Sequence, residues 1–265
     1  MGMRRRCFKP KLIYIYFSEA IGTAFLVGVG LSIVILNNGA GAPVTSYIPD
    51  PSARRAITGF LFGATGCVIA LSPIGRISGA HINPIVSFAF WLRKRIFTRH
   101  LLGYVVAQLV GSVAGSLPLL LWGKWGDSIG YGNTVPGPGR TAAAFVGETV
   151  TSFLLVTGIF FFCGHRKLRR FTPYLMPPLY GLMVWAEGAL SGTSTNPARS
   201  FGPAVVSGVW TGWWLYWLAP LTGAVLAVWL FRLPGLKWWK VLPKLRHRGR
   251  AARPKNASLR PWPED

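Results

Sequence analysis

Six long apolar runs dominate the chain, and polar residues are confined almost entirely to the segments between and beyond them. About 20 apolar residues are needed for a helix to cross the hydrocarbon core of a bilayer, so each run predicts one membrane-spanning helix. Inside the runs, the only Asp, Glu, Lys or Arg residues are Glu19, Glu148 and Glu187. The pattern predicts an all-α membrane protein whose spans cover residues 12–36, 56–74, 101–122, 141–163, 171–192 and 209–231.

The positive charges predict how these spans are oriented. Of the 29 Lys and Arg residues, 24 lie before the first run or after the second, fourth and sixth runs, which places them all on one side of the membrane. Lys and Arg accumulate on the cytoplasmic side, so both termini are expected there, in a multi-pass protein of the cell (inner or plasma) membrane. The net charge of +22 would otherwise suggest a nucleic-acid partner. Its placement in the loops argues for no nucleic acid and for the lipid bilayer.

The segments at the two ends are basic. Residues 1–11 form a short cytoplasmic N-terminus, without a cleavable signal peptide, because the first run is too long and no small-residue cleavage site follows it. Residues 233–265 form a basic cytoplasmic tail that contains Lys237-Trp238-Trp239-Lys240. Two interpretations of this tail stay open, namely an interfacial anchor on anionic lipid and a disordered tail.

Catalytic and metal-binding patterns are not found. Cys7, Cys67 and Cys163 are unclustered and are interpreted as small hydrophobic residues. The His residues at 81, 100, 165 and 247 are scattered. Without a metal-ligand spacing, a nucleophile–base pair or a phosphate-binding loop, we expect no enzyme activity, no metal and no cofactor.

An internal repeat organises the chain. Residues 78–85 and 191–198 share the pattern Ser-Gly-x-x-x-Asn-Pro, and residues 104–111 match residues 216–223 as Tyr-x-x-Ala-x-Leu-x-Gly. Glu19 and Glu148 form a third pair, one in the first span of each half. The predicted channel domain, 12–232, therefore consists of two halves, 12–123 and 140–232. Since each half contains three spans, an odd number, the second half enters the membrane from the opposite side, as in inverted-repeat transport proteins.

The Asn-Pro motifs predict two half-helices. The apolar stretches 85–92 and 198–206 are too short to span the membrane. Pro84 and Pro197 suit the first turn of a helix and Asn83 and Asn196 suit its N-cap. Because the repeat is inverted, the two half-helices enter from opposite faces and their N-termini meet near the midplane. The alternative is a pair of ordinary helix-capping motifs in a helical bundle.

Such a junction predicts a pore for neutral solutes. Non-helical backbone at this depth is tolerated where it lines a water-filled cavity, so loop carbonyls would face the solute. The two Asn amides add donors, while two positive helix ends repel cations and protons. The predicted pore-lining loop residues are Ala80, His81, Ile82, Ser194 and Thr195.

With these motifs, residues 12–231 resemble the aquaporin and aquaglyceroporin family, the major intrinsic proteins. The resemblance lies in Ser-Gly-Ala-His-Ile-Asn-Pro (78–84), Asn-Pro-Ala-Arg-Ser-Phe-Gly-Pro-Ala (196–204), the paired Glu residues and the Gln108/Pro220 repeat. It implies six transmembrane helices with two re-entrant half-helices, a homotetramer with one pore per subunit, and a water-channel-like member of bacterial type. The chain departs from the family at Ile85, where Ala is usual, although the second motif keeps Ala198.

The resemblance also assigns a selectivity filter. Arg199, the Thr193 carbonyl and Val184 match three filter positions, and the fourth is either Phe62 or Gly63. Val184 stands where water-selective relatives carry His, which implies a wider filter. In contrast, Ser200, Ala204 and the pair Tyr216-Trp217 resemble the water-channel subgroup.

The carboxylates inside the spans have different expected roles. Glu19 and Glu148 match family positions that accept hydrogen bonds from the re-entrant loops, with a proton relay as the alternative. Glu187 is outside the common pattern. It is expected either to pair with Arg199 or with loop N–H groups, or to line the outer mouth without a partner.

The sequence therefore predicts a passive channel for water, with small neutral solutes as a second cargo. A glycerol or urea facilitator is the first alternative. A secondary active transporter and a structural junction protein of the same fold are the others.

Overall fold

The structure is a computed structural model that describes residues 11–233. In this part of the chain the long helices are α1 (Leu12–Asn38), α3 (Pro51–Leu71), α6 (Thr98–Ser116), α8 (Thr141–Gly164), α9 (Thr172–Ser191) and α11 (Leu215–Leu230). The Asn-Pro motifs begin α5 (Pro84–Leu92) and α10 (Pro197–Ser207). Short α-helices are α2 (Pro43–Tyr47), α4 (Pro73–Ser78) and α7 (Gly123–Asp127), and 3₁₀ helices are η1 (Leu117–Trp122), η2 (Gly130–Gly132) and η3 (Arg169–Phe171). Cys7, His247 and the segment 237–240 lie outside the described residues.

Each predicted span corresponds to a helix, with shifted ends. By length and composition, the stretches 12–38, 51–71, 98–127 and 141–164 can cross a membrane. Helix α9 contains Pro177 and Pro178 in its interior. The last helix, α11, has only 16 residues, because residues 209–214 form turns around Gly212, whose φ is +65°.

Capping explains why α3 begins before residue 56. The Asp50 side chain accepts hydrogen bonds from the N–H groups of Ser52 and Ala53, both at 3.0 Å, and Pro51 occupies the first helical position. These backbone hydrogen bonds also lower the pKa of the Asp50 carboxyl, so the cap is charged at neutral pH.

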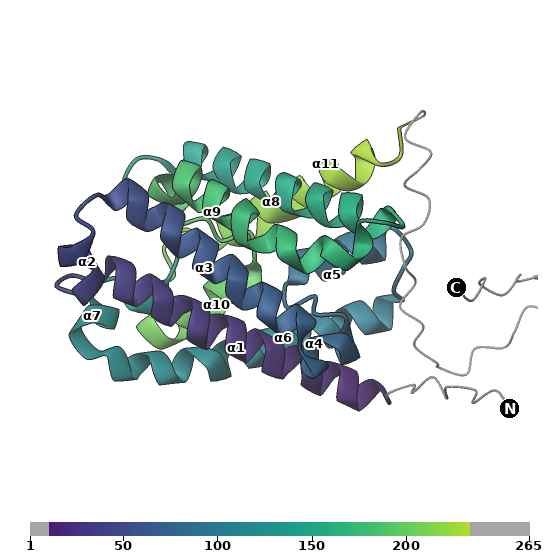
Figure 1. Cartoon of the computed structure of the whole chain (residues 1–265), viewed down its shortest axis with the longest axis horizontal. Coiled ribbons are helices and arrows are strands. Elements are labelled where there is room, and N and C mark those ends of the chain that lie inside the picture. The colour runs from purple at the N-terminus through teal and green to yellow at the C-terminus, as the bar shows by residue number, and fades with distance from the viewer. Residues whose placement is uncertain (1–10, 234–265) are drawn as a thin grey trace, which may run out of the picture.

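The helices form two groups, and the contact of α3 with α9 is one of those that join them (Figure 1). In the first half, α1 packs on α3 and α6, and in the second half, α8 packs on α9 and α11. Helices α3 and α9 pack against each other and connect the halves. The start of α1 and the end of α11 lie at one end of the bundle, whereas α2 and α7 lie at the opposite end.

The repeated glycines allow equivalent helix pairs to touch. A Cβ atom on Gly111 of α6 would overlap the carbonyl oxygen of Ala20 on α1, and a Cβ atom on Gly223 of α11 would overlap that of Thr149 on α8. Small residues at membrane helix interfaces let backbones approach in this way. The paired Tyr…Gly segments of the sequence thus mark the same packing contact in each half.

This contact gives a first prediction. Gly111→Ala is expected to force α6 away from α1 and to lower the free energy of unfolding by about 1–3 kcal/mol, as overpacking commonly does. Thermal unfolding of the purified protein in detergent measures the effect. Gly66→Ala is the control, since its Cβ would meet only Leu26 Cδ1 at 3.9 Å. Equal melting temperatures for the two variants would contradict the predicted packing role.

Candidate functional site

Two buried carboxylates hold the two Asn-Pro loops. Glu19 accepts hydrogen bonds from the His81 N–H at 2.9 Å and the Ile82 N–H at 2.7 Å. At the equivalent place, Glu148 accepts from the Ser194 N–H at 2.5 Å and the Thr195 N–H at 2.8 Å. Both carboxylates are fully buried. Further donors are the Gln108 side chain to Glu19, at 2.8 Å, and the Ser191 hydroxyl to Glu148, at 2.6 Å.

Two tyrosines anchor the start of the loops in the same symmetric manner. The Tyr104 hydroxyl donates to the Ser78 carbonyl at 2.5 Å, and the Tyr216 hydroxyl donates to the Ser191 carbonyl at 2.8 Å. These tyrosines belong to the repeated segments 104–111 and 216–223, so the segments position both the helix contacts and the loops.

The loop backbones adopt left-handed conformations that side chains rarely favour. Ala80 and Ile82 have φ values of 48° and 42°, and the equivalent Thr193 and Thr195 have 49° and 50°. For the β-branched residues among them this conformation is an outlier that other contacts must stabilise. The hydrogen bonds to Glu19 and Glu148 are such contacts, because they fix the N–H groups of Ile82 and Thr195.

The asparagines of the two motifs meet at the junction of α5 and α10. Each caps its own helix, since Asn83 Oδ1 accepts from the Ile85 N–H at 2.8 Å and Asn196 Oδ1 accepts from the Ala198 N–H at 3.0 Å. Each also donates to the other loop: Asn83 Nδ2 to the Thr195 carbonyl, and Asn196 Nδ2 to the Ile82 carbonyl, both at 2.9 Å. An amide nitrogen carries two hydrogens, so one remains on each side chain for a solute.

Two cavities approach this junction from opposite ends of the bundle. The inner cavity, of about 360 Å³, contains both asparagines in its lining and reaches Arg76 and Arg169 at the end where α1 begins. The outer cavity, of about 310 Å³, reaches Asn38 at the end of α1. Two residues, Phe62 and Tyr180, line both cavities.

The residues expected to form the filter are gathered at the outer cavity. Its lining includes Val184, Thr193 and Arg199. The Arg199 guanidinium donates through Nη1 to the Gly132 carbonyl at 2.5 Å, and its Cζ lies 5.9 Å from the centre of the Phe62 ring.

The geometry distinguishes Phe62 from Gly63, which the sequence left open. A Cβ atom on Gly63 would overlap the Met176 carbonyl oxygen, so Gly63 serves the close contact of α3 with α9. Phe62 instead faces Arg199. Counting back from Asn83 is ambiguous because the short helix α4 is inserted between α3 and the first loop.

Glu187 lies behind the second loop, against Thr193 of that loop and Gly147 of α8. It is buried, its Oε2 accepts from the Thr193 hydroxyl, and it is absent from the outer cavity's lining. The Arg199 guanidinium donates to the Gly132 carbonyl, and no ion pair joins it to Glu187 among residues 11–233. Val184 and Gly188 occupy the cavity face of α9, whereas Glu187 is rotated toward α8, where a Cβ on Gly147 would lie 2.7 Å from its Cγ. Its Oε1 has no hydrogen-bond partner among residues 11–233.

The atypical Ile85 is accommodated by apolar neighbours. It is almost fully buried in a cluster that includes Val156 of α8 and Ala224 of α11. In the second half, Ala198 is also fully buried, and its carbonyl accepts from the Ser112 hydroxyl. The larger side chain of Ile85 therefore packs against α8 and α11, away from the Asn83 cap, which stays intact.

Two residues of the site, Tyr180 and Ser112, were not predicted from the sequence. Tyr180 lies four residues before Val184 and so shares its helix face, which is a signal that could have identified it. Ser112 joins α6 to α10 by accepting from the Gly202 N–H at 2.9 Å and donating to the Ala198 carbonyl. No sequence pattern marks that contact.

Comparisons with known proteins agree with this architecture. The family model described as Major intrinsic protein matches residues 7–231. Nodulin-26 of Glycine max is 34% identical, covering 85% of this chain and 78% of the relative. Aquaporin TIP1-2 of Zea mays is 36% identical, covering 74% of this chain and 79% of the relative. Aquaporin A of Dictyostelium discoideum is 30% identical, covering 88% of this chain and 82% of the relative.

The aquaglyceroporin from Plasmodium falciparum has the same fold. Its crystal structure superposes with a TM-score of 0.66, covering 83% of this chain and 96% of that chain at 18% identity. The predicted all-α channel fold is thereby confirmed. The relatives come from plants and a slime mould, so a specifically bacterial type is not supported. The chain is a multi-pass membrane channel without enzymatic activity, for water or small neutral solutes, and it belongs to the major intrinsic protein family.

Proposed function

We propose that the channel conducts water and excludes ions and protons. The observation that carries this proposal is the Asn83–Asn196 junction, where two helix N-termini and two amide donors converge on the lining of the inner cavity. Positive helix ends repel cations and orient a water oxygen toward the amides. A water held by these donors cannot at the same time accept a proton from a neighbouring water. Proton transfer along the row of water molecules in the pore is therefore disfavoured.

The outer constriction supports the same proposal. We assign Phe62, Val184, Thr193 and Arg199 to the selectivity filter, because these residues line the outer cavity together. The Arg199 guanidinium adds a buried positive charge that repels cations. The aromatic ring of Phe62 narrows the passage beside it.

Permeability measurements test the proposal directly. In reconstituted vesicles, stopped-flow light scattering is expected to show fast water flux with low temperature dependence and much slower glycerol and urea flux. Asn83→Asp is expected to reduce water flux by roughly tenfold or more, because a carboxylate loses the donor to the Thr195 carbonyl and faces that oxygen without a bond. Empty vesicles provide the baseline. Wild-type vesicles at this baseline would contradict the proposal.

Val184 favours a second candidate, a facilitator of glycerol, urea or another small uncharged solute. The small apolar side chain leaves room in the outer cavity where a larger residue would narrow it. Solute flux as fast as water flux in the same vesicles would support this candidate. A secondary active transporter would show saturable, ion-coupled flux, and a junction protein would show none.

We also propose that the end with the chain termini faces the cytoplasm of a cell membrane. Arg76 and Arg169 lie at that end of the inner cavity, and Lys and Arg accumulate on the cytoplasmic side. The proposed assembly is a homotetramer. A shallow apolar groove between α3 and α9, lined by Phe60, Leu182 and Trp185 among others, suits lipid or a neighbouring subunit.

A further inference from the structure

The lining of the two cavities changes in order along α9. Gly188 and Val184 line only the outer cavity, and Met176 and Pro173 line only the inner one. Tyr180, between them on the same helix face, lines both. The Tyr180 side chain therefore stands at the level where one cavity ends and the other begins.

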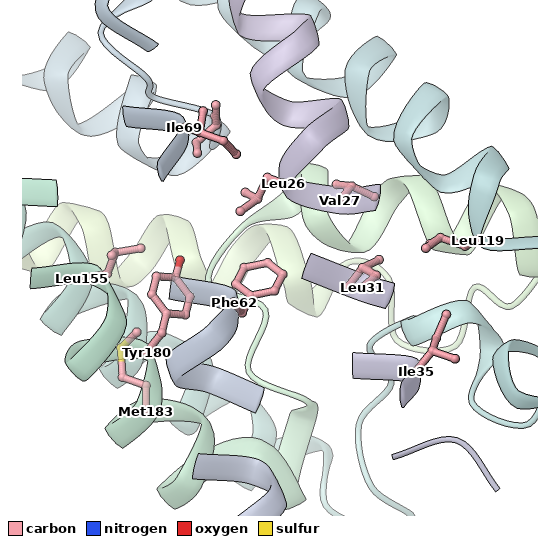
Figure 2. Close-up of a cluster of buried hydrophobic side chains, with 11 residues drawn as sticks. Leu26, Val27, Leu31, Ile35, Phe62, Ile69, Leu119, Leu155, Tyr180 and Met183 are labelled. Atoms are coloured by element: carbon pink, nitrogen blue, oxygen red, sulfur yellow. The ribbon is translucent and has the colours of Figure 1, made fainter. Parts of the chain in front are cut away.

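Helix α3 changes in the same order. Thr58 and Gly59 line only the outer cavity, Gly66 and Ala70 line only the inner one, and Phe62 lines both. The rings of Phe62 and Tyr180 lie side by side in Figure 2, with centroids 5.6 Å apart and planes at 43°. Two facing helices thus place an aromatic ring at one level of the path.

Two glycines fix the Phe62 ring and the Tyr180 backbone. A Cβ atom on Gly59 would overlap the Tyr180 carbonyl oxygen, and a Cβ atom on Gly30 of α1 would lie 2.6 Å from the Phe62 ring. The α3 and α9 backbones touch at Gly59, and the Phe62 ring packs directly on α1 at Gly30, so the Phe62 ring cannot move back toward α1. The contact between the two rings is consequently held by the packing of α1, α3 and α9.

The Tyr180 hydroxyl has a defined direction. It lies 3.0 Å from Thr195 Oγ1, and the Thr195 hydroxyl donates its own hydrogen to the Ser194 carbonyl at 2.8 Å. Tyr180 must therefore donate to Thr195. A phenolic oxygen can donate and accept at once, so the Tyr180 oxygen keeps lone pairs that can accept a hydrogen bond from a passing water.

We propose that Tyr180, together with the filter residue Phe62, forms a second constriction inward of Val184, Thr193 and Arg199, and that Tyr180 sets the size limit which Val184 leaves relaxed. This inference rests on the proposed water channel and adds the residue that determines its specificity. The Tyr180 ring excludes solutes wider than a single row of water molecules. The Tyr180 oxygen accepts a hydrogen bond and so replaces one that water loses on entering the channel.

Two substitutions distinguish the effect of the Tyr180 ring from the effect of its hydroxyl. Tyr180→Val removes both, and glycerol and urea permeability are expected to rise at least about tenfold, so that the ratio of solute to water permeability rises. Tyr180→Phe keeps the ring, so the solutes stay excluded, but water flux is expected to fall about two- to tenfold, the range that one hydrogen bond commonly carries. Stopped-flow measurement in vesicles with water, glycerol and urea reads out both effects.

Matched controls show which residue limits the size of the solute that can pass. Val184→Ala enlarges the outer position only, so its glycerol permeability is expected to stay well below that of Tyr180→Val. Leu182→Ala is the unaltered-path control, since this side chain is 58% exposed on the outside of α9. If Val184→Ala admits glycerol and Tyr180→Val does not, the second constriction is refuted. Size-exclusion profiles show which variants are folded, and Tyr180→Leu replaces Tyr180→Val if the latter is not.

The outcomes distinguish this inference from the function on which it depends. Absence of water flux in the wild type contradicts the proposed function and the constriction together. A wild type that conducts water and excludes glycerol, with Tyr180→Val behaving identically, contradicts the constriction alone.

Discussion

Glu148→Ala is expected to abolish water conduction and to destabilise the channel strongly. The carboxylate accepts three hydrogen bonds from the second loop, from the Ser191 hydroxyl and the N–H groups of Ser194 and Thr195. Its removal leaves two backbone N–H groups unsatisfied in a buried loop, and each such group costs about 1–3 kcal/mol. Thr195 would also lose the contact that holds it at a positive φ. Thermal unfolding in detergent and vesicle water flux measure the two effects.

Two further variants sharpen this test. Glu148→Gln keeps one acceptor oxygen but turns an amide NH₂ toward the remaining donors, so an intermediate loss of stability is expected. Glu19→Ala removes the equivalent acceptor from the first loop and should resemble Glu148→Ala. Wild-type flux and melting temperature in Glu148→Ala would show that the loop is held by other contacts.

Arg199→Val is expected to raise the leak of protons and small cations at least about tenfold. The guanidinium is a buried positive charge in the lining of the outer cavity. A unit charge about 5 Å from the path contributes roughly 3 kcal/mol at an effective dielectric constant of about 20, which exceeds the energy of a tenfold change in rate. A pH-sensitive dye inside vesicles measures the proton leak.

Glycerol flux through Arg199 variants distinguishes the effect of the charge of this side chain from the effect of its size. Because the rings of Phe62 and Tyr180 remain in Arg199→Val, glycerol is expected to stay excluded, and the double variant with Tyr180→Val should admit it. Arg199→Lys keeps the charge but loses the planar donor fork that binds the Gly132 carbonyl. It is therefore expected to retain cation exclusion with reduced water flux. An unchanged proton leak in Arg199→Val would assign exclusion to the helix N-termini alone.

The sequence was informative wherever a feature is repeated. The twinned Asn-Pro motifs predicted two half-helices, which begin at Pro84 and Pro197, and the twinned Glu residues predicted loop supports. Each member of a pair served as a check on the other. The hydrophobic runs likewise located the long helices, because bilayer thickness dictates their length.

Features without a repeat were harder to predict, because they depend on the rotation of each helix about its axis. Apolar runs that face lipid on one side and protein on the other carry little periodicity. The rotations of α3 and α9 are set by the glycines at their contact, Gly59 and Gly63. That contact turns Phe62 and Tyr180 into the path and Glu187 toward α8. The spacing of Tyr180 and Val184 indicates that they share a helix face, but nothing in the sequence indicates how Phe62 and Glu187 are turned.

The crossed asparagine bonds have a consequence for how the protein is made. Asn83 donates to a carbonyl of the second loop and Asn196 to a carbonyl of the first, so neither loop can complete its bonds alone. A nascent chain that has released only its N-terminal half from the ribosome carries a re-entrant segment with an unpaired amide and an unpaired carbonyl. Biogenesis of the pore is thus a late event, reached only when the C-terminal half has inserted and docked.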